Sequence, residues 1–165
     1  IHFDNLVYMA AAGSIRDYED SVFPYLRRQR IQPTAMKKTM VYHLTLHEGA
    51  ERANMFPISS PIPLMPWSLL VWIDSFLTNP ATPEDRTLGR YANFFRAFHN
   101  TDHGPGDDLR PQIRFKSFDW GARVYDTDPQ AHEDFNTCPF WNQQFWEPDK
   151  RVSCTPTRTL LRHNF

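Results

Sequence analysis

The chain has 165 residues, enough for one ordinary domain with its own hydrophobic core. Its net charge is −1 at pH 7, which gives no overall electrostatic drive toward nucleic acid or toward an anionic membrane. Aromatic residues make up 15% of the chain and prolines number 14, a composition that argues against disorder and predicts irregular segments anchored by bulky rings.

Charged residues are segregated along the chain. Residues 21–47 carry only basic charges, residues 124–149 only acidic ones, and residues 150–165 only basic ones again. Two interpretations are open. Either these blocks pair with one another or face solvent within the fold, or they meet oppositely charged surfaces of a partner.

A helix is predicted to begin near Ser14. Ser14 stands at a cap position and Asp17 follows three residues later, which is the pattern of a capping box. Pro24 is expected to bend or stop this helix just after Phe23, and the chain then continues as helix or turn to Pro33.

The segment 34–48 fits two patterns. Met36, Met40 and Leu44 recur at helical spacing, whereas alternate residues from Met40 to Leu46 are apolar or aromatic, as they would be in a strand. Because Gly49 follows a plausible helix end, we predict a helix here.

The most apolar stretch of the chain is residues 61–80, and positions 53–73 carry no charge. Prolines at positions 57, 61, 63 and 66 remove backbone donors, so only residues 66–78 are expected to be helical. A helix of this length spans roughly 20 Å. A bilayer core is about 30 Å thick, so this helix is predicted not to cross a membrane.

Almost every side chain of this predicted helix is apolar, and Trp67 and Trp72 are the largest. A helix that is apolar nearly all round is normally buried. Three destinations are open: the protein's own core, the surface of a partner subunit, or a membrane interface with the tryptophans at headgroup level.

A second helix is predicted over residues 83–99. Thr82 suits the cap position, Pro83 suits the first turn, and the two acids that follow favour the positive end of the helix dipole. Apolar residues at positions 88, 91, 95 and 98 then lie along one face. With residues 66–78, this helix would form a helical hairpin at the centre of the domain.

Regular patterns become rare after residue 100. Ile113 and Phe115 alternate with basic residues and predict one short strand. From residue 126 onward no amphipathic period is present, although aromatic residues are frequent. We predict that this tail wraps its own domain or a neighbour, using Phe140, Trp141, Phe145 and Trp146.

Two histidine pairs are the candidate metal ligands. His43 and His47 are four residues apart, as are His99 and His103, and on a helix this spacing places both rings on one face. The zinc-protease pattern, in which Glu directly follows the first His, is absent. Because a chain with seven histidines often shows this spacing by chance, surface or interface histidines are the simpler interpretation.

Other chemistry has weaker support. Cys138 and Cys154 form no CxxC pair, so we expect two reduced thiols or, in an oxidising compartment, one disulfide. The glycine-rich turn at 103–108 lacks the Lys-Ser/Thr of a phosphate loop, and no GxSxG nucleophile motif occurs. The basic region near Tyr25 and Tyr42 has the mixture used by RNA-stacking surfaces, but the whole chain is not basic.

These patterns together predict a mainly α fold. It would be a small helical domain with a central helical hairpin, long aromatic- and proline-rich irregular extensions, and at most one short hairpin of strand. Residues 1–125 would form this domain with an extended N-terminal arm, and residues 126–165 an irregular C-terminal extension.

The expected function is that of a non-catalytic accessory subunit, without a cofactor, in a large membrane-associated complex of the mitochondrial respiratory-chain type. The first residue is Ile1 rather than Met, so either a targeting segment was removed or the numbering describes a processed or incomplete sequence. A processed N-terminus would fit a peripheral position at the mitochondrial inner membrane. Other protein subunits are the expected partners, with contact to a membrane interface and no nucleic acid. The expected partner-binding residues are Trp67, Trp72, Phe140, Trp141, Phe145 and Trp146.

Two alternative functions remain open. The first is a soluble metal-dependent enzyme that uses the pairs His43/His47 and His99/His103. The second is a peripheral subunit of a ribonucleoprotein. Metal content lost on substitution of His43 would favour the enzyme, and release of the chain by nuclease would favour the ribonucleoprotein.

Overall fold

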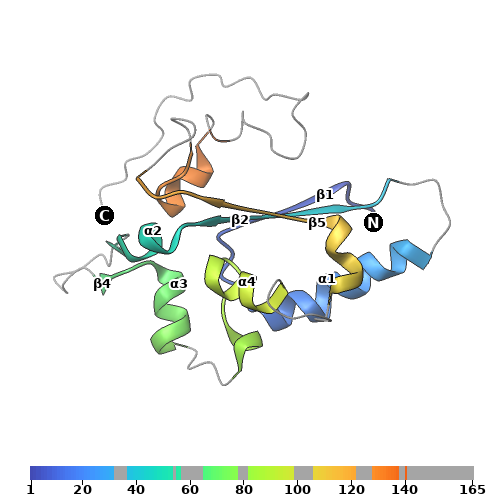
Figure 1. Ribbon diagram of the computed structural model, residues 1–165, viewed down its shortest axis with the longest axis horizontal. Helices are drawn as coiled ribbons and strands as arrows, with labels where there is room; N and C mark the ends of the chain where they lie inside the picture. Colours follow the sequence, from blue (N-terminus) through green and yellow to red (C-terminus); the bar gives the residue numbers. More distant parts are fainter. Residues whose placement is uncertain are drawn as a thin grey trace.

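The computed structural model describes residues 1–31, 37–53, 55–56, 65–77, 82–98, 106–121, 128–137 and 140 (Figure 1). In chain order its elements are strand β1 (Asn5–Met9), helix α1 (Ile15–Ile31), strand β2 (Met40–Leu46), helix α2 (Glu48–Ala53), strands β3 (Met55–Phe56) and β4 (Met65–Pro66), helix α3 (Leu69–Trp72), π-helix η1 (Ile73–Leu77), 3₁₀-helix η2 (Pro83–Asp85), helix α4 (Tyr91–Phe98), 3₁₀-helix η3 (Asp107–Gln112), strand β5 (Ile113–Phe118) and 3₁₀-helix η4 (His132–Asn136).

Three parallel strands form the main sheet, in the order β1-β2-β5. The register places Tyr8 beside His43 and His43 beside Phe115, so these three side chains form one row across the sheet. Helices alternate with the strands in a Rossmann-like α/β arrangement. The predicted mainly α fold is therefore wrong, because β1 and β2 lie in segments for which no strand was predicted.

Strand β2 lies at the centre of the sheet, where the sequence predicted a helix. It pairs with β1 on one side and with β5 on the other, and five of its seven residues are buried. Parallel strands covered on both faces tend to be apolar throughout, so the strand alternation in the sequence was only partial. Pairing with two neighbouring strands outweighs a weak local preference for helix.

Helix α1 begins where the sequence predicted. The Asp17 amide donates to the Ser14 hydroxyl at 3.0 Å, and the Ser14 amide donates to the Asp17 carboxylate at 3.4 Å, which confirms the capping box. The helix continues through Pro24 and ends at Ile31, so of the two predicted alternatives a stop at Pro24 is wrong and the continuation as helix is confirmed. The lost backbone bond at Pro24 is tolerated because Phe23 and Leu26 are buried on either side of it.

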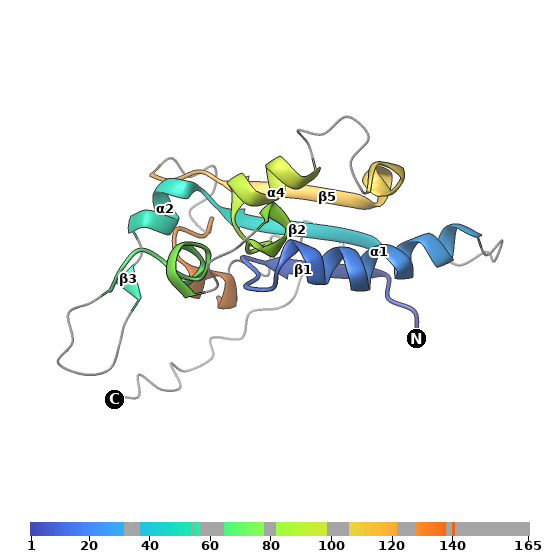
Figure 2. The same ribbon diagram turned by 90° about the horizontal axis from the view of Figure 1, so that it is seen from below.

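Helices α1 and α4 cover one face of the sheet, and η4 lies on the other (Figures 1 and 2). Side chains alternate between the two faces along each strand. From β2, Val41 enters the core beneath the helices, and Leu44 enters the core on the η4 side. Phe135 of η4 and Phe140 complete this second core. The proposed division of the chain at residue 125 stays a prediction.

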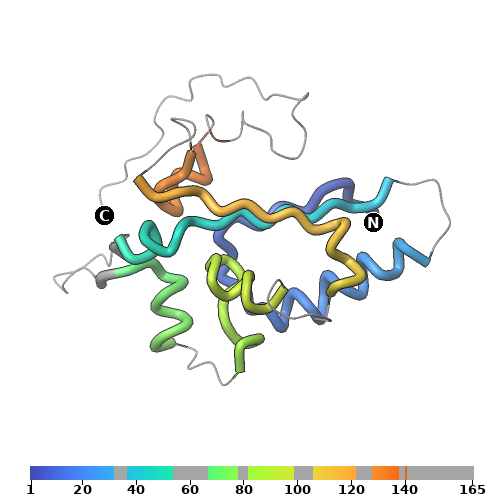
Figure 3. Tube along the Cα trace, viewed as in Figure 1, coloured from blue at the N-terminus to red at the C-terminus, as the bar shows by residue number. Residues whose placement is uncertain are grey.

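The apolar helix predicted over residues 66–78 is found as α3 and η1, and it lies at the edge of the molecule beside α2 (Figure 3). Ser68 caps it, since the Ser68 hydroxyl accepts a bond from the Val71 amide. Only Leu70, Val71 and Asp74 of the two elements are buried. No helix within the described ranges combines the length and the hydropathy needed to cross a bilayer.

The helix predicted over residues 83–99 is divided. The predicted start at Thr82 is confirmed, because the Thr82 amide and hydroxyl both donate to the Asp85 carboxylate at 3.0 Å. Only the single turn η2 follows, and α4 begins anew at Tyr91. The predicted central helical hairpin is therefore wrong, because residues 86–89 pair with the loop after β1 rather than continuing the helix.

Candidate functional site

In Rossmann-like folds, ligands bind at the C-terminal ends of the strands, often at the loop after the first strand. Here the chain's own backbone covers that loop. The Ile15 amide donates to the Arg86 carbonyl at 3.0 Å, and the Gly89 amide donates to the Ala11 carbonyl at 2.8 Å. A Cβ on Gly89 would lie 2.3 Å from the backbone of Ala10, so the two segments are in direct contact. The loop after β1 and the first amide of α1 are therefore already engaged by residues 86–89.

A charged network lies next to this crossing. Arg90 donates to Asp74 at 2.9 Å and to Glu48 at 2.7 Å, with its own side chain only 12% exposed. Asn93 and the Thr87 amide also donate to Asp74, at 2.6 and 2.8 Å. Burial alone would lower the pKa of Arg90, but the two carboxylates outweigh burial and the pKa is raised. These contacts fix α2, η1 and α4 relative to one another.

A second buried carboxylate, Glu51, lies where α2, α3 and η4 meet. One of its oxygens accepts the Ser68 hydroxyl and lies 3.0 Å from Nε2 of His132. The other oxygen has no hydrogen-bond partner among the described residues. Because the Ser68 hydroxyl binds the carboxylate rather than the imidazole, these groups lack the serine–histidine pair of a nucleophilic hydrolase. The contact between His132 and Glu51 joins η4 to α2.

The predicted metal ligands His43 and His47 do not converge. His43 lies in β2 and His47 directly follows the end of that strand, and four residues of extended chain correspond to about 13 Å. His43 is 1% exposed, stacked on Tyr8 at 5.2 Å and against Phe94 at 4.4 Å, and burial lowers its pKa to about 3. His47 is exposed, and its Nδ1 accepts the Gly49 amide at 2.9 Å.

The other predicted metal and thiol positions lie outside the described residues, namely His99, His103, Cys138 and Cys154. Within the described part of the chain, no three His, Cys, Asp or Glu side chains are grouped so as to hold a metal ion. The histidine-based metal site therefore stays a prediction without geometric support from His43 and His47.

The basic block pairs in part within the fold. Arg27 and Arg30 of α1 lie 3.2 and 3.1 Å from the Asp108 carboxylate. Hydrogen bonding to Arg27 is the largest influence on the Asp108 carboxyl, and its pKa is lowered. This finding favours intramolecular pairing over an RNA surface for these two side chains.

Phe140 is fully buried and packs edge-on against Phe118 and Phe135 at 5.9 and 5.2 Å, so it belongs to the protein's own core. Of the other predicted partner-binding residues, three lie outside the described residues, namely Trp141, Phe145 and Trp146.

Trp67 and Trp72, the remaining predicted partner-binding residues, belong to an exposed apolar surface. The rings of Trp67 and Phe76 stack with their centroids 6.3 Å apart, and Trp72 contacts Phe76 at 4.6 Å. Phe76 is 55% exposed and Leu77 is 64% exposed. We call this surface the α3 face and define it by the exposed or half-buried side chains of Trp67, Leu69, Trp72, Phe76 and Leu77.

The backbone at Trp67 is unusual. Its φ of 77° lies in the left-handed region, which costs a bulky residue roughly 1–2 kcal/mol. Trp67 directly follows β4 and precedes the Ser68 cap, so this conformation turns the chain into α3. Strain of this kind persists where the surrounding structure imposes it, and it is concentrated at functional surfaces.

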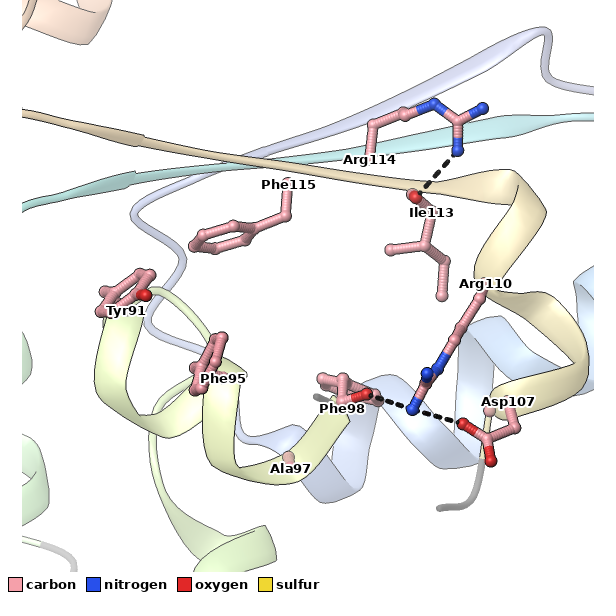
Figure 4. A pocket seen from close by; sticks show the side chains of 10 residues that line it. Tyr91, Phe95, Ala97, Phe98, Asp107, Arg110, Ile113, Arg114 and Phe115 are labelled. Atoms are coloured by element: carbon pink, nitrogen blue, oxygen red, sulfur yellow. Dashed lines mark hydrogen bonds and ion pairs between the residues drawn. The ribbon is translucent and has the colours of Figure 1, made fainter. Parts of the chain in front are cut away.

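A pocket of about 320 Å³ lies between α4 and β5 (Figure 4). Tyr91, Phe95 and Phe98 project from α4, and Ile113 and Phe115 project toward them from β5. Four of the ten lining residues therefore carry aromatic rings, and these rings stand on two elements that are adjacent in space and distant in sequence.

One end of this pocket is polar. Arg110 of η3 lies 2.7 Å from the Asp107 carboxylate and donates to the Phe98 carbonyl at 3.2 Å (Figure 4). The positive charge of the guanidinium is thus balanced beside the apolar walls. Arg114 also lines the pocket, but its side chain points away from the rings and donates to the carbonyls of Pro111 and Ile113.

The sequence indicated the two walls of the pocket without indicating the pocket. Positions 91, 95 and 98 were placed on one helix face, and Ile113 and Phe115 on one strand face. That these faces oppose each other follows from the pairing of β5 with β2 beneath α4, which no local pattern encodes.

The fold and its surfaces define a small α/β domain with a blocked ligand edge, an exposed aromatic face and an apolar pocket. Comparison with protein-family models, with curated proteins and with solved structures finds no match to this chain.

Proposed function

We propose that this protein is a non-catalytic accessory subunit that docks into a larger protein assembly through the α3 face. The observation that carries the proposal is the exposure of Phe76 and Leu77, both more than half accessible, with Trp67 stacked on the Phe76 ring and Trp72 in tilted contact with it. Contiguous exposed apolar side chains mark interaction surfaces in soluble domains. Tryptophan is also among the residues that contribute most to binding energy at such surfaces.

The charge of the α3 face favours a protein partner over a lipid surface. Interfacial membrane helices carry Lys or Arg on their polar side to bind anionic headgroups. Residues 67–77 contain neither, and their one acid, Asp74, is buried and paired with Arg90 at 2.9 Å. An electrically neutral face made of rings and aliphatic side chains fits an uncharged apolar groove on another subunit.

The blocked ligand edge agrees with a non-catalytic role. The loop after β1 is engaged with residues 86–89, and the Asp74 and Glu48 carboxylates are held by Arg90. Association of the whole assembly with the mitochondrial inner membrane stays a prediction from the sequence.

Photo-crosslinking tests this proposal directly. A benzophenone amino acid at position 76 of the full chain, in extract of the source cells, should crosslink to one defined protein in a high-mass complex. The same probe at Phe3, which is 46% exposed and lies outside the α3 face, should not give that product. A crosslink from position 76 to a second copy of this chain would replace the proposal with self-association.

Size-exclusion chromatography of the same extract tests whether the chain needs the α3 face to enter the complex. The wild-type chain should elute with the complex, and the double variant Phe76→Ser with Leu77→Ser should elute as a free chain. Both side chains are exposed, so the variant should still melt cooperatively. A wild-type chain that elutes as a free, cooperatively folded monomer, or a variant that stays in the complex, would contradict the proposal.

A further inference from the structure

We propose that the pocket between α4 and β5 binds a small, uncharged aromatic molecule of about two fused rings that carries one hydroxyl group. This inference is independent of docking through the α3 face, because no residue of that face lines the pocket. It rests on the size of the pocket, the nature of its walls and the charge balance at its polar end.

The size of the pocket sets the size of the ligand. Its volume is about 320 Å³, at the lower end of the range for small-molecule sites, which begins at about 300 Å³. A dry apolar cavity of about 150 Å³ is known to hold one benzene ring. A space about twice as large therefore fits two fused rings rather than a nucleotide or a long lipid chain.

The walls favour an aromatic ligand. Tyr91 lies 5.6 Å from Phe95 and 5.5 Å from Phe115, measured between ring centroids, so rings from α4 and β5 border the same space. Offset and edge-to-face ring contacts at such separations add about 0.5–1.5 kcal/mol per pair to area burial. Phe95 is 37% exposed, which places it at the mouth of the pocket rather than in the core.

The polar end selects against a charged ligand. Arg110 lies 2.7 Å from Asp107, and it also donates to the Phe98 carbonyl. A carboxylate would have to compete with Asp107 for the guanidinium and would be repelled by that same acid. A hydroxyl can accept from Arg110 and donate to Asp107 without disturbing their charge balance, so it is the group that fits this end.

Calorimetric titration of the purified full chain with 2-naphthol, naphthalene and 2-naphthoate tests the ligand class. We expect 2-naphthol to bind saturably at one site, about five- to tenfold more tightly than naphthalene, as one net hydrogen bond would give. We expect 2-naphthoate to bind more weakly than 2-naphthol. The absence of saturable 2-naphthol binding, or tighter binding of 2-naphthoate, would overturn the proposal.

Variants locate the site. Phe95→Ala removes one wall and should weaken 2-naphthol binding about tenfold, and Ile113→Trp should block binding by filling the pocket. The matched control is Phe76→Ala, which removes an exposed ring on the α3 face and should leave 2-naphthol binding unchanged. Equal binding by Phe95→Ala and wild type, with both chains melting cooperatively, would place the ligand elsewhere and overturn the proposal. Because Phe76 is tested in the docking experiment and Phe95 here, the two proposals can fail separately.

Discussion

Two groups of aromatic rings in this protein have similar spacings and opposite surroundings. Around His43, the rings of Tyr18 and Phe94 lie at 4.9 and 4.4 Å, and both side chains are buried. On the α3 face, Trp72 and Phe76 lie 4.6 Å apart, with Phe76 more than half exposed. Ring-to-ring contact alone therefore does not distinguish a core from a binding surface.

The difference arises from what each group is attached to. His43 belongs to the central strand, between two neighbouring strands and beneath the helices, so its neighbours are enclosed from several directions. The α3 face belongs to a short helix at the edge of the molecule, joined to the body through Leu70, Val71 and the Asp74–Arg90 pair. Rings in the first group stabilise the fold, whereas rings in the second remain available for a partner.

The largest expected effect comes from the protonation of His43. Burial holds its pKa at about 3, whereas an unperturbed histidine has a pKa of about 6.5. Between these values the unfolded chain binds a proton that the folded chain does not. The free energy of unfolding should therefore fall as the pH decreases from 6.5 to 3, by up to about 5 kcal/mol at about 1.4 kcal/mol per pH unit.

Urea unfolding at pH 7, 5.5 and 4 measures this dependence. His43→Phe keeps a ring in the core and removes the titrating group, so its unfolding free energy should change less with pH than that of the wild type. His47→Gln, which alters an exposed histidine, is the control and should retain the wild-type slope. If His43→Phe and the wild type show the same slope, His43 is not buried as described.

The next prediction compares the loss of unfolding free energy when one ring is removed from each of the two groups. Phe94 is fully buried and contacts His43 and Phe115 at 4.4 and 4.8 Å, so Phe94→Ala should lower the free energy of unfolding by about 3–5 kcal/mol. Phe76→Ala should change it by no more than about 1 kcal/mol, because the ring is already largely in solvent. Urea titration of both variants at pH 7 gives the comparison. Similar losses would show that the α3 face is part of the core.

Several local features could be predicted from the sequence because they depend on residues within one turn of each other. The Ser14–Asp17 capping box and the Thr82–Asp85 turn both form as predicted. The short strand at Ile113 and Phe115 is also found, in β5. In the two turns a side chain and the nearby backbone determine the local structure, whereas β5 shows the predicted alternation but also pairs with β2.

The main sheet could not be predicted in the same way. Tyr8, His43 and Phe115 are adjacent in the sheet but lie far apart in the sequence, and only long-range pairing makes β1 and β2 strands. The pocket depends on the same pairing. The exposure of the α3 face could not be predicted either, because an apolar segment is compatible with a core, a partner surface or a membrane. Its position in the tertiary structure decides among these three.

The smallest expected effect on the free energy of unfolding concerns Trp67, and it tests whether the backbone at this residue of the α3 face is strained. In the middle of an ordinary helix or strand, Gly makes a protein less stable than Ala does, by roughly 0.5–1 kcal/mol. At φ 77° the order should reverse, so Trp67→Gly should be more stable than Trp67→Ala by about 1 kcal/mol. Urea unfolding of the pair measures the difference, and both variants should lose partner binding alike because both lack the indole. If Trp67→Ala is the more stable variant, the backbone at Trp67 is unstrained, and the α3 face keeps only its exposure as a mark of function.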